Sequence, residues 1–203
     1  MKEALRFGAL GDRCVHVCVD MQRIFAEDTD WSTPWMLKVL PKVEHIVAAH
    51  PSETIFTRFL TLASAEEGQG TWKRYYQRWH QLTTRELAPG LLDLMPPLAR
   101  YVPPAAVFDK TVYSPWLGTE FETVLRRRDA DTVVITGGET DVCVLGTVLG
   151  AVDRGLRTIL VTDAVCSSSD ESHDALMGLY HLRYGQQVET IDTDTLLEVW
   201  PGG

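Results

Sequence analysis

The sequence is poor in cysteine and lacks any long apolar run. Its four cysteines, Cys14, Cys18, Cys143 and Cys166, are too few in 203 residues for the disulfide framework of a small secreted protein. No stretch of 18 or more apolar residues occurs, and the N-terminal segment MKEALRFGALGDR has no apolar core. We therefore expect no membrane span and no signal peptide, and a cytoplasmic protein with reduced thiols.

Basic residues are also scarce. Lys and Arg number 19 against 28 Asp and Glu, which gives a formal net charge of −9. This balance argues against binding to nucleic acid or to an anionic membrane. With 45% hydrophobic and 23% charged residues, no internal repeat and no low-complexity segment, the chain is expected to fold as a single domain over residues 1–203.

Strand-like and helix-like segments alternate along the chain. Short apolar runs rich in β-branched residues predict strands at 14–20, 54–59, 106–110, 132–138, 158–164 and 188–191. Helical spacing of apolar residues predicts helices at 36–50, 118–128, 142–155 and 170–185. This alternation predicts an α/β fold, whose ligands bind beyond the carboxyl ends of the strands.

Reactive side chains lie at those strand ends. Asp20 ends the first predicted strand, Lys110 the third, and Cys143 begins the helix after the fourth. A helix N-terminus and a nearby cation lower the pKa of a cysteine, so we expect Lys110 to help activate the Cys143 thiol. Asp20 is placed to take the thiol proton and return it to a leaving amine.

Each of these residues also has an ordinary interpretation. A buried cysteine is commonly a small core residue, an aspartate at a strand end a helix cap, and a single lysine a solvated charge. Their joint occurrence at one edge of the predicted sheet favours the chemical interpretation.

Three segments carry a family resemblance. VCVDMQRIF (17–25), VFDKTVYSPWLGTEFETVL (107–125) and ITGGETDVCVLGTVLGAVDRG (135–155) resemble, in order, the signature blocks of the isochorismatase-like cysteine hydrolases. The resemblance covers nearly the whole chain. It implies a three-layer α/β/α sandwich with a central, mostly parallel six-stranded sheet.

The resemblance also implies a set of site residues. Asp20, Lys110 and Cys143 match a catalytic triad in which the cysteine attacks a carbonyl carbon. A cis peptide bond is expected between Gly138 and Glu139, and the backbone N–H groups of Glu139 and Cys143 are expected to hold the oxyanion. The role of the Glu139 side chain stays open.

The implied reaction is hydrolysis of a C–N bond in a small amide, ureido or carbamoyl compound. Isochorismatase-type vinyl ether hydrolysis and a non-catalytic binding or scaffold role remain alternatives. Metal-binding members place several ligands after the second strand, whereas residues 57–80 here contain a single histidine, His80. We therefore expect no metal and no cofactor, as in metal-free amidohydrolases such as N-carbamoylsarcosine amidase.

Four residues near the strand ends are candidates for the substrate pocket. Phe25, Tyr113 and Trp116 follow the predicted catalytic residues closely, and Arg58 offers a planar fork for a carboxylate, although a surface ion pair is an equally good interpretation. Cys14 and Cys18 are expected in the core, and Cys166 has no assigned role.

The segment 70–81 has aromatic residues on one face of a predicted helix, namely Trp72, Tyr75, Tyr76 and Trp79. We prefer packing on the body of the protein or on a second subunit, with a lid contributed to a neighbouring active site in an oligomer as the alternative. The expected partners are a small-molecule substrate and further copies of the chain in a dimer or tetramer.

Overall fold

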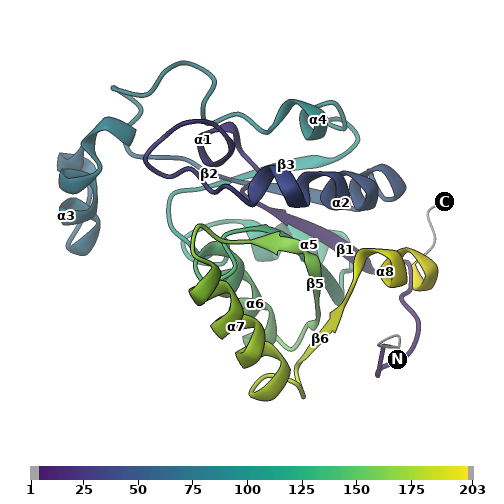
Figure 1. Cartoon of the computed structure of the whole chain (residues 1–203). Helices are drawn as coiled ribbons and strands as arrows, with labels where there is room; N and C mark the ends of the chain where they lie inside the picture. The colour runs from purple at the N-terminus through teal and green to yellow at the C-terminus, as the bar shows by residue number, and fades with distance from the viewer. Residues whose placement is uncertain (1–4, 201–203) are drawn as a thin grey trace.

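The centre of the fold is a six-stranded parallel sheet, seen in a computed structural model that describes residues 5–200 (Figure 1). Every neighbouring pair of strands in the sheet is parallel. The strands are β1 (Cys14–Val19), β2 (Thr54–Phe59), β3 (Ala106–Lys110), β4 (Thr132–Gly138), β5 (Arg157–Cys166) and β6 (Val188–Ile191). Their spatial order is β3-β2-β1-β4-β5-β6.

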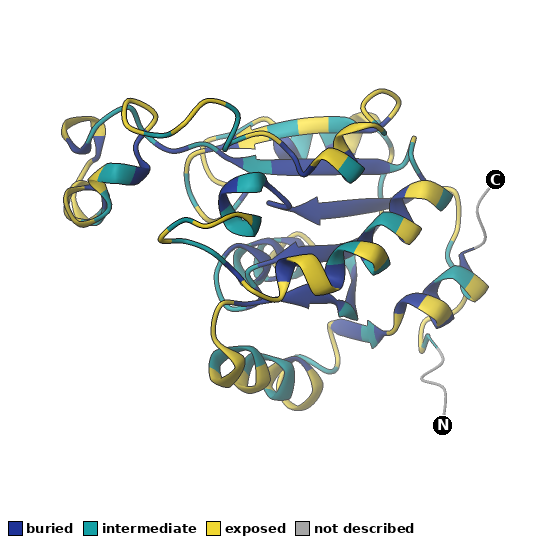
Figure 2. Cartoon of the chain, turned by 45° about the horizontal axis from the view of Figure 1, so that its top comes forward, coloured by how far each residue is buried: buried dark blue, intermediate teal, exposed yellow. Residues whose placement is uncertain are grey.

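Helices cover both faces of this sheet. The α-helices are α1 (Arg23–Ala26), α2 (Met36–Ala49), α3 (Thr71–Arg78), α4 (Pro96–Ala99), α5 (Phe121–Arg127), α6 (Cys143–Asp153), α7 (Asp170–Leu182) and α8 (Thr193–Val199). Short 3-10 helices η1 (Ala65–Glu67) and η2 (His80–Leu82) flank α3. Helix α3 stands away from the sheet in both views (Figures 1 and 2).

Alternating side chains on the strands build two separate cores. On β1, Cys14 and Cys18 pack with residues of α2 and α8, whereas Val15 and Val17 pack with residues of α5, α6 and α7. All six residues of β1 are buried, because the sheet is covered on both faces (Figure 2). The predicted three-layer α/β/α sandwich is confirmed, and the sheet is wholly parallel.

The predicted elements match the structure closely in position. All six predicted strands are present, with β1 ending one residue early at Val19 and β5 running two residues further, to Cys166. The five predicted helices, including the one at 70–81, correspond to α2, α3, α5, α6 and α7. Helices α1, α4 and α8 were not predicted, and the first two have only four residues each, which give little periodic signal. The predicted domain of residues 1–203 extends at both ends beyond the described residues.

The strand order reverses direction beside β1. The chain runs from β1 outward to β2 and β3, then returns to β4 on the other side of β1. The carboxyl ends of β1 and β4 therefore form the topological switch point at which open α/β sheets bind ligands. Gly137 allows these ends to approach closely, since it has a φ of +103° and an added Cβ would lie 2.0 Å from the carbonyl oxygen of Val19.

Between residues 5 and 200, no helix is both long and apolar enough to cross a membrane.

Candidate active site

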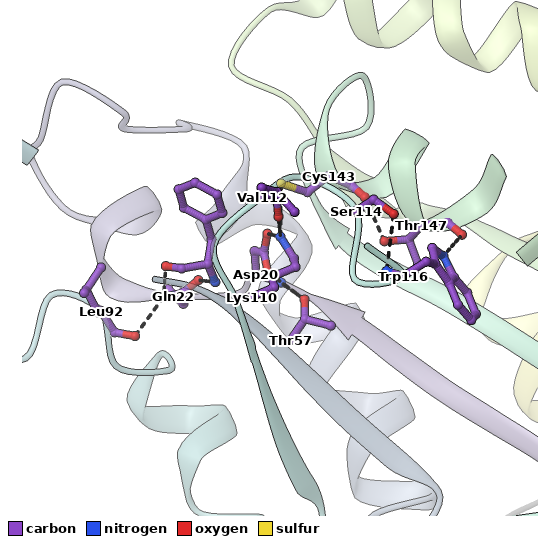
Figure 3. Close-up of polar contacts among 11 residues, drawn as sticks. Asp20, Gln22, Thr57, Leu92, Lys110, Val112, Ser114, Trp116, Cys143 and Thr147 are labelled. Atoms are coloured by element: carbon purple, nitrogen blue, oxygen red, sulfur yellow. Dashed lines mark hydrogen bonds and ion pairs between the residues drawn. The ribbon is translucent and has the colours of Figure 1, made fainter. Parts of the chain in front are cut away.

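Asp20 and Lys110 form a buried ion pair at the switch point (Figure 3). Lys110 Nζ lies 2.6 Å from Asp20 Oδ2, and both side chains are almost completely buried. The hydroxyl of Thr57, on the intervening strand β2, donates to Asp20 Oδ1 at 2.6 Å. Both carboxylate oxygens of Asp20 are thus held, one by a cation and one by a neutral donor.

Lys110 also contacts the cysteine. Its Nζ lies 3.4 Å from Cys143 Sγ and donates to the carbonyl oxygen of Val112 at 3.3 Å. Burial opposes the positive charge, but the neighbouring Asp20 and Cys143 outweigh it and raise the pKa of Lys110. The ammonium therefore stays charged and ties the carboxylate to the sulfur.

Cys143 is the first residue of α6, as expected, but its thiol is not acidified. Burial raises the pKa of Cys143 well above its ordinary value, and the Asp20 carboxylate raises it further. Lys110 lowers it, but by less. The expectation that Lys110 and the helix N-terminus lower this pKa is therefore not met, because it left out desolvation and the charge of Asp20. The resting thiol is protonated and needs a base.

The turn after β4 supplies backbone donors beside this thiol. The peptide bond between Gly138 and Glu139 is cis, as the resemblance implied. The carbonyl oxygen of Glu139 accepts the N–H groups of Val142 and Val144 at 3.1 and 3.0 Å. Within residues 5–200, the N–H groups of Glu139 and Cys143 have no hydrogen-bond acceptor of their own. They are the pair expected to hold an oxyanion.

The Glu139 carboxylate takes part in the loop contacts around the site. Its Oε1 accepts the backbone N–H of Ser168 at 2.9 Å and the hydroxyl of Thr33 at 3.5 Å. The side chain thus joins the turn after β4 to two other loops, and it lines the same cavity as Cys143. This answers the question that the sequence left open for Glu139.

A cavity of about 310 Å³ opens onto Cys143. Phe25 and Tyr113, both predicted pocket residues, line it. Its other lining residues are Asp30, Trp31, Ser32, Phe59, Tyr75, Trp79, Glu139, Val142 and Ser168. A larger cavity of about 500 Å³ adjoins Cys166 and His173, but Cys143 does not line it. We therefore assign the site to the smaller cavity.

Arg58 does not belong to this cavity, which corrects its prediction as a pocket residue. Its guanidinium binds the Asp109 carboxylate through two hydrogen bonds of 2.7 and 2.9 Å, and Asp93 lies 3.8 Å away. The next residue, Phe59, is the one that lines the cavity. Since neighbouring strand residues point to opposite faces, a shift of one position exchanges the two roles.

Trp116 was also predicted to line the substrate pocket, and the structure corrects this. Its indole N–H donates to the carbonyl oxygen of Thr147 at 3.0 Å, and its ring packs on Phe121 at a centroid distance of 4.9 Å. An added Cβ at Gly150 would lie 2.0 Å from the Trp116 ring, so the glycine makes room for the indole against α6. Figure 3 shows the Trp116 ring beside Thr147, away from the Lys110 ammonium. Trp116 is a core residue.

The main residues missed from sequence are aromatic. Trp31 lies in the loop between α1 and α2, where no periodicity marks it, and Phe59 was passed over for Arg58. Phe59 is paired with Lys110 in the register of β2 and β3, and the Lys110 Nζ lies 5.1 Å from its ring centroid. The pairing with Lys110 identifies Phe59 as a residue near the site, but the register of the two strands cannot be known from the sequence.

Helix α3 contributes to the cavity of its own chain. Tyr75 and Trp79, from the predicted aromatic face, line the cavity with Cys143. The Trp31 ring lies 5.7 Å from Tyr75 and 6.4 Å from Trp79. The aromatic face thus packs on the body of the protein, as preferred from the sequence, and also walls the cavity.

Gln22 fixes the end of β2 against the loop before α4. Its side-chain amide accepts the Phe59 N–H at 2.7 Å and donates to the carbonyl oxygens of Phe59 and Leu92 at 3.1 and 2.8 Å. Gln22, two residues after Asp20, therefore serves to position the end of β2 against this loop.

The other three thiols and His173 have structural roles. Cys14 and Cys18 are core residues, as predicted. Cys166 belongs to the same core, and its carbonyl oxygen accepts the N–H of Thr140 at 2.8 Å. His173 Nδ1 is hydrogen bonded to Thr140 Oγ1 at 2.9 Å. Across the described part of the chain, no three His, Cys, Asp or Glu residues gather where they could hold a metal ion.

The fold and these contacts define a class: α/β proteins with a cysteine, a lysine and an aspartate gathered at the carboxyl edge of a parallel sheet. The model of the isochorismatase domain matches residues 14–193. The chain therefore belongs to the isochorismatase family.

Relatives and solved structures agree with this assignment. The chain is 30% identical to maleamate amidohydrolase of Pseudomonas putida over 113 residues, which cover 52% of this chain and 53% of that protein. It spans about half the length of the curated relatives it matches. A cysteine hydrolase of Pseudomonas syringae pv. phaseolicola superposes with a TM-score of 0.81 at 22% identity, covering 98% of this chain and 97% of the other. N-carbamoylsarcosine amidase of Thermoplasma acidophilum gives a TM-score of 0.71 at 22% identity, covering 89% and 96%. These two structures share its fold.

Proposed function

We propose that the protein is a cysteine hydrolase that cleaves the C–N bond of a small amide, ureido or carbamoyl compound. The observation that carries this proposal is the contact of one buried ammonium, that of Lys110, with both a carboxylate and a thiol. The names of two similar proteins, an amidohydrolase and an amidase, support the same reaction class.

The first half of the reaction forms an acyl-enzyme. Asp20 takes the proton of the Cys143 thiol, and the sulfur attacks the carbonyl carbon. The negative charge that develops on the carbonyl oxygen is held by the free N–H groups of Glu139 and Cys143. Asp20 then gives its proton to the leaving nitrogen, the C–N bond breaks, and a thioester to Cys143 remains.

The second half returns the enzyme to its starting state. Water enters after the amine has left, and Asp20 takes its proton as the oxygen attacks the thioester carbon. The C–S bond breaks, the carboxylic or carbamic acid leaves, and Asp20 returns the proton to the sulfur. Lys110 holds the side chains of Asp20 and Cys143 in position throughout, because its ammonium contacts both. No step calls for a metal or another cofactor.

The test is ammonia release from a panel of simple amides, ureides and N-carbamoyl amino acids. Cys143→Ala should abolish turnover, and acid quenching of the unaltered protein should trap an acyl adduct on Cys143 in peptide mass spectra. Cys14→Ala is the matched control, because Cys14 lies at the opposite end of β1 from Asp20. Full activity of Cys143→Ala would overturn the mechanism, and activity on isochorismate alone would favour ether hydrolysis.

A further inference from the structure

The charged side chains around the cavity are both acidic. Asp30 and Glu139 line it, and among the described residues that form its wall there is no lysine, arginine or histidine. A pocket for a carboxylate substrate normally presents a cation to it. The nearest candidate from the sequence, Arg58, is engaged by Asp109 outside the cavity.

Neither acid is neutralised by a basic partner. Glu139 Oε1 accepts from Ser168 N–H and the Thr33 hydroxyl, and Asp30 Oδ2 accepts from the Gln81 amide. Within residues 5–200, no ion pair involves either carboxylate. All three neighbours donate without carrying charge, so the cavity wall keeps its negative potential.

The remaining wall is largely aromatic. Trp31 lies at the centre of the cluster, with ring centroids of its neighbours at 5.7 to 6.4 Å. The rings that line the cavity are Phe25, Trp31, Phe59, Tyr75, Trp79 and Tyr113. The faces of aromatic rings attract cations, and clusters of such rings bind alkylammonium groups.

The nearby cations do not cancel the negative potential of the cavity wall. Lys110 is paired with Asp20, and with a protonated thiol the three side chains carry no net charge together. The Arg78 guanidinium lies 5.0 Å from the Trp79 ring centroid but does not line the cavity.

We propose that the substrate is a small amide that carries a positively charged ammonium group. This inference rests on the proposed hydrolysis and names the substrate class for the same site. The amide carbonyl lies at Cys143, and the ammonium group contacts the aromatic rings with Glu139 and Asp30 nearby. The two acids and the rings then act on the same end of the substrate.

The test compares three amides of similar size and different charge. They are 4-(trimethylammonio)butanamide, its neutral isostere 5,5-dimethylhexanamide, and glutaramate, in which three methylenes separate the charge from the reacting carbon. We expect kcat/KM for the cation to exceed that for the neutral isostere at least tenfold, with glutaramate the poorest. The advantage should shrink at high salt.

Charge-removing variants locate the effect. Glu139→Gln and Asp30→Asn should each lower the cation-to-neutral ratio of kcat/KM at least threefold. Asp28→Asn is the matched control, since Asp28 lies on the same loop but outside the cavity wall, and its ratio should equal that of the unaltered protein.

The outcomes separate this inference from the proposed function. If the neutral or anionic amide is hydrolysed as fast as the cationic amide or faster, the proposed substrate class is wrong, but the proposed hydrolase activity is supported. If none of the amides in the wider panel is hydrolysed, the proposed function fails. Titration of tryptophan fluorescence with 4-(trimethylammonio)butanamide and its isostere then decides the charge preference, and equal affinities would overturn it.

Discussion

The Lys110 ammonium lies 3.4 Å from the Cys143 sulfur, yet the thiol beside this cation is harder to ionise than an ordinary cysteine. Burial is the main cause, and the Asp20 carboxylate adds to it. A cation that is already paired with an anion offers a thiolate little net stabilisation. The arrangement suits a thiol that is protonated at rest and gives its proton to a nearby base.

Replacing Asp20 by asparagine should therefore separate thiol reactivity from turnover. The pKa of Cys143 should fall, because Lys110 remains and the opposing negative charge is gone. Alkylation of Cys143 by iodoacetamide at pH 7.5 should accelerate by roughly threefold for each unit of that fall, because the thiolate fraction rises tenfold while the nucleophilicity of the thiolate decreases. Turnover should drop by a factor on the order of 10² to 10⁴, because the general base is lost.

Peptide mass spectrometry of the alkylated protein gives both the rate and the site. Cys14 is the internal reference, since burial raises its pKa and Asp20 is not among the charges that act on it. Thr57→Val is the matched variant, because it removes a hydrogen bond to Asp20 and keeps the charge. Slower alkylation in Asp20→Asn than in the unaltered protein would contradict this electrostatic account.

The sheet and the cluster at its edge were predictable because both depend on local signals. Continuous apolar runs such as residues 132–138 mark strands buried on both faces, and parallel strands bring their carboxyl ends together. Asp20 follows β1 directly, Lys110 ends β3, and Cys143 begins the helix after β4. The fold alone is therefore enough to gather them.

The pocket was less predictable because it depends on contacts between distant segments. Arg58 and Phe59 differ by one position and point to opposite faces, so the sequence does not tell which one faces Lys110. Trp116 follows Lys110 closely in the sequence, but its ring packs against Gly150 of α6. The raised pKa of Cys143 likewise follows from burial and from the carboxylate of Asp20, which lies just after β1.

Removal of divalent metals should leave turnover unchanged. The described residues offer no group of three His, Cys, Asp or Glu side chains, and the proposed steps use only protein groups. Protein dialysed against EDTA should keep the kcat of the untreated sample, with metal content checked by mass spectrometry. A loss of activity that zinc or manganese restores would show that the site uses a metal.

The stability of the fold should fall as the solution becomes acidic. His16 is buried in β1 between the hydroxyls of Thr54 and Thr136, and burial lowers its pKa to about 3. A folded-state pKa below the unfolded value of 6.5 gives stability that is complete above pH 6.5 and is lost towards pH 3. The contribution of His16 to the free energy of unfolding should shrink by about 1.4 kcal/mol per pH unit in that window.

Urea unfolding at several pH values between 7.5 and 4 measures this slope. His16→Leu should flatten it, leaving a smaller part due to His50, whose pKa burial also lowers. His45→Leu is the control because His45 is exposed, and it should keep the slope of the unaltered protein. An unchanged slope in His16→Leu would show that the buried imidazole is not the source.

The aromatic face of α3 should act on the cavity of its own chain. Trp79 lines that cavity and packs on Trp31, so Trp79→Ala should raise KM by about tenfold, in line with the loss of about 1.4 kcal/mol of contact energy. Lys73→Ala, at an exposed position in α3, should leave KM unchanged. Initial rates over a range of substrate concentrations give both constants.

Mixing two variants shows whether a neighbouring subunit supplies the aromatic face. Cys143→Ala chains keep Trp79, and Trp79→Ala chains keep Cys143, so sites shared between chains would recover a normal KM in mixed oligomers. If each site is built within one chain, mixing does not restore a normal KM, and this is the result we expect. Light scattering of the same samples tests the predicted dimer or tetramer, and recovery of the normal KM on mixing would reassign α3 to the neighbouring subunit.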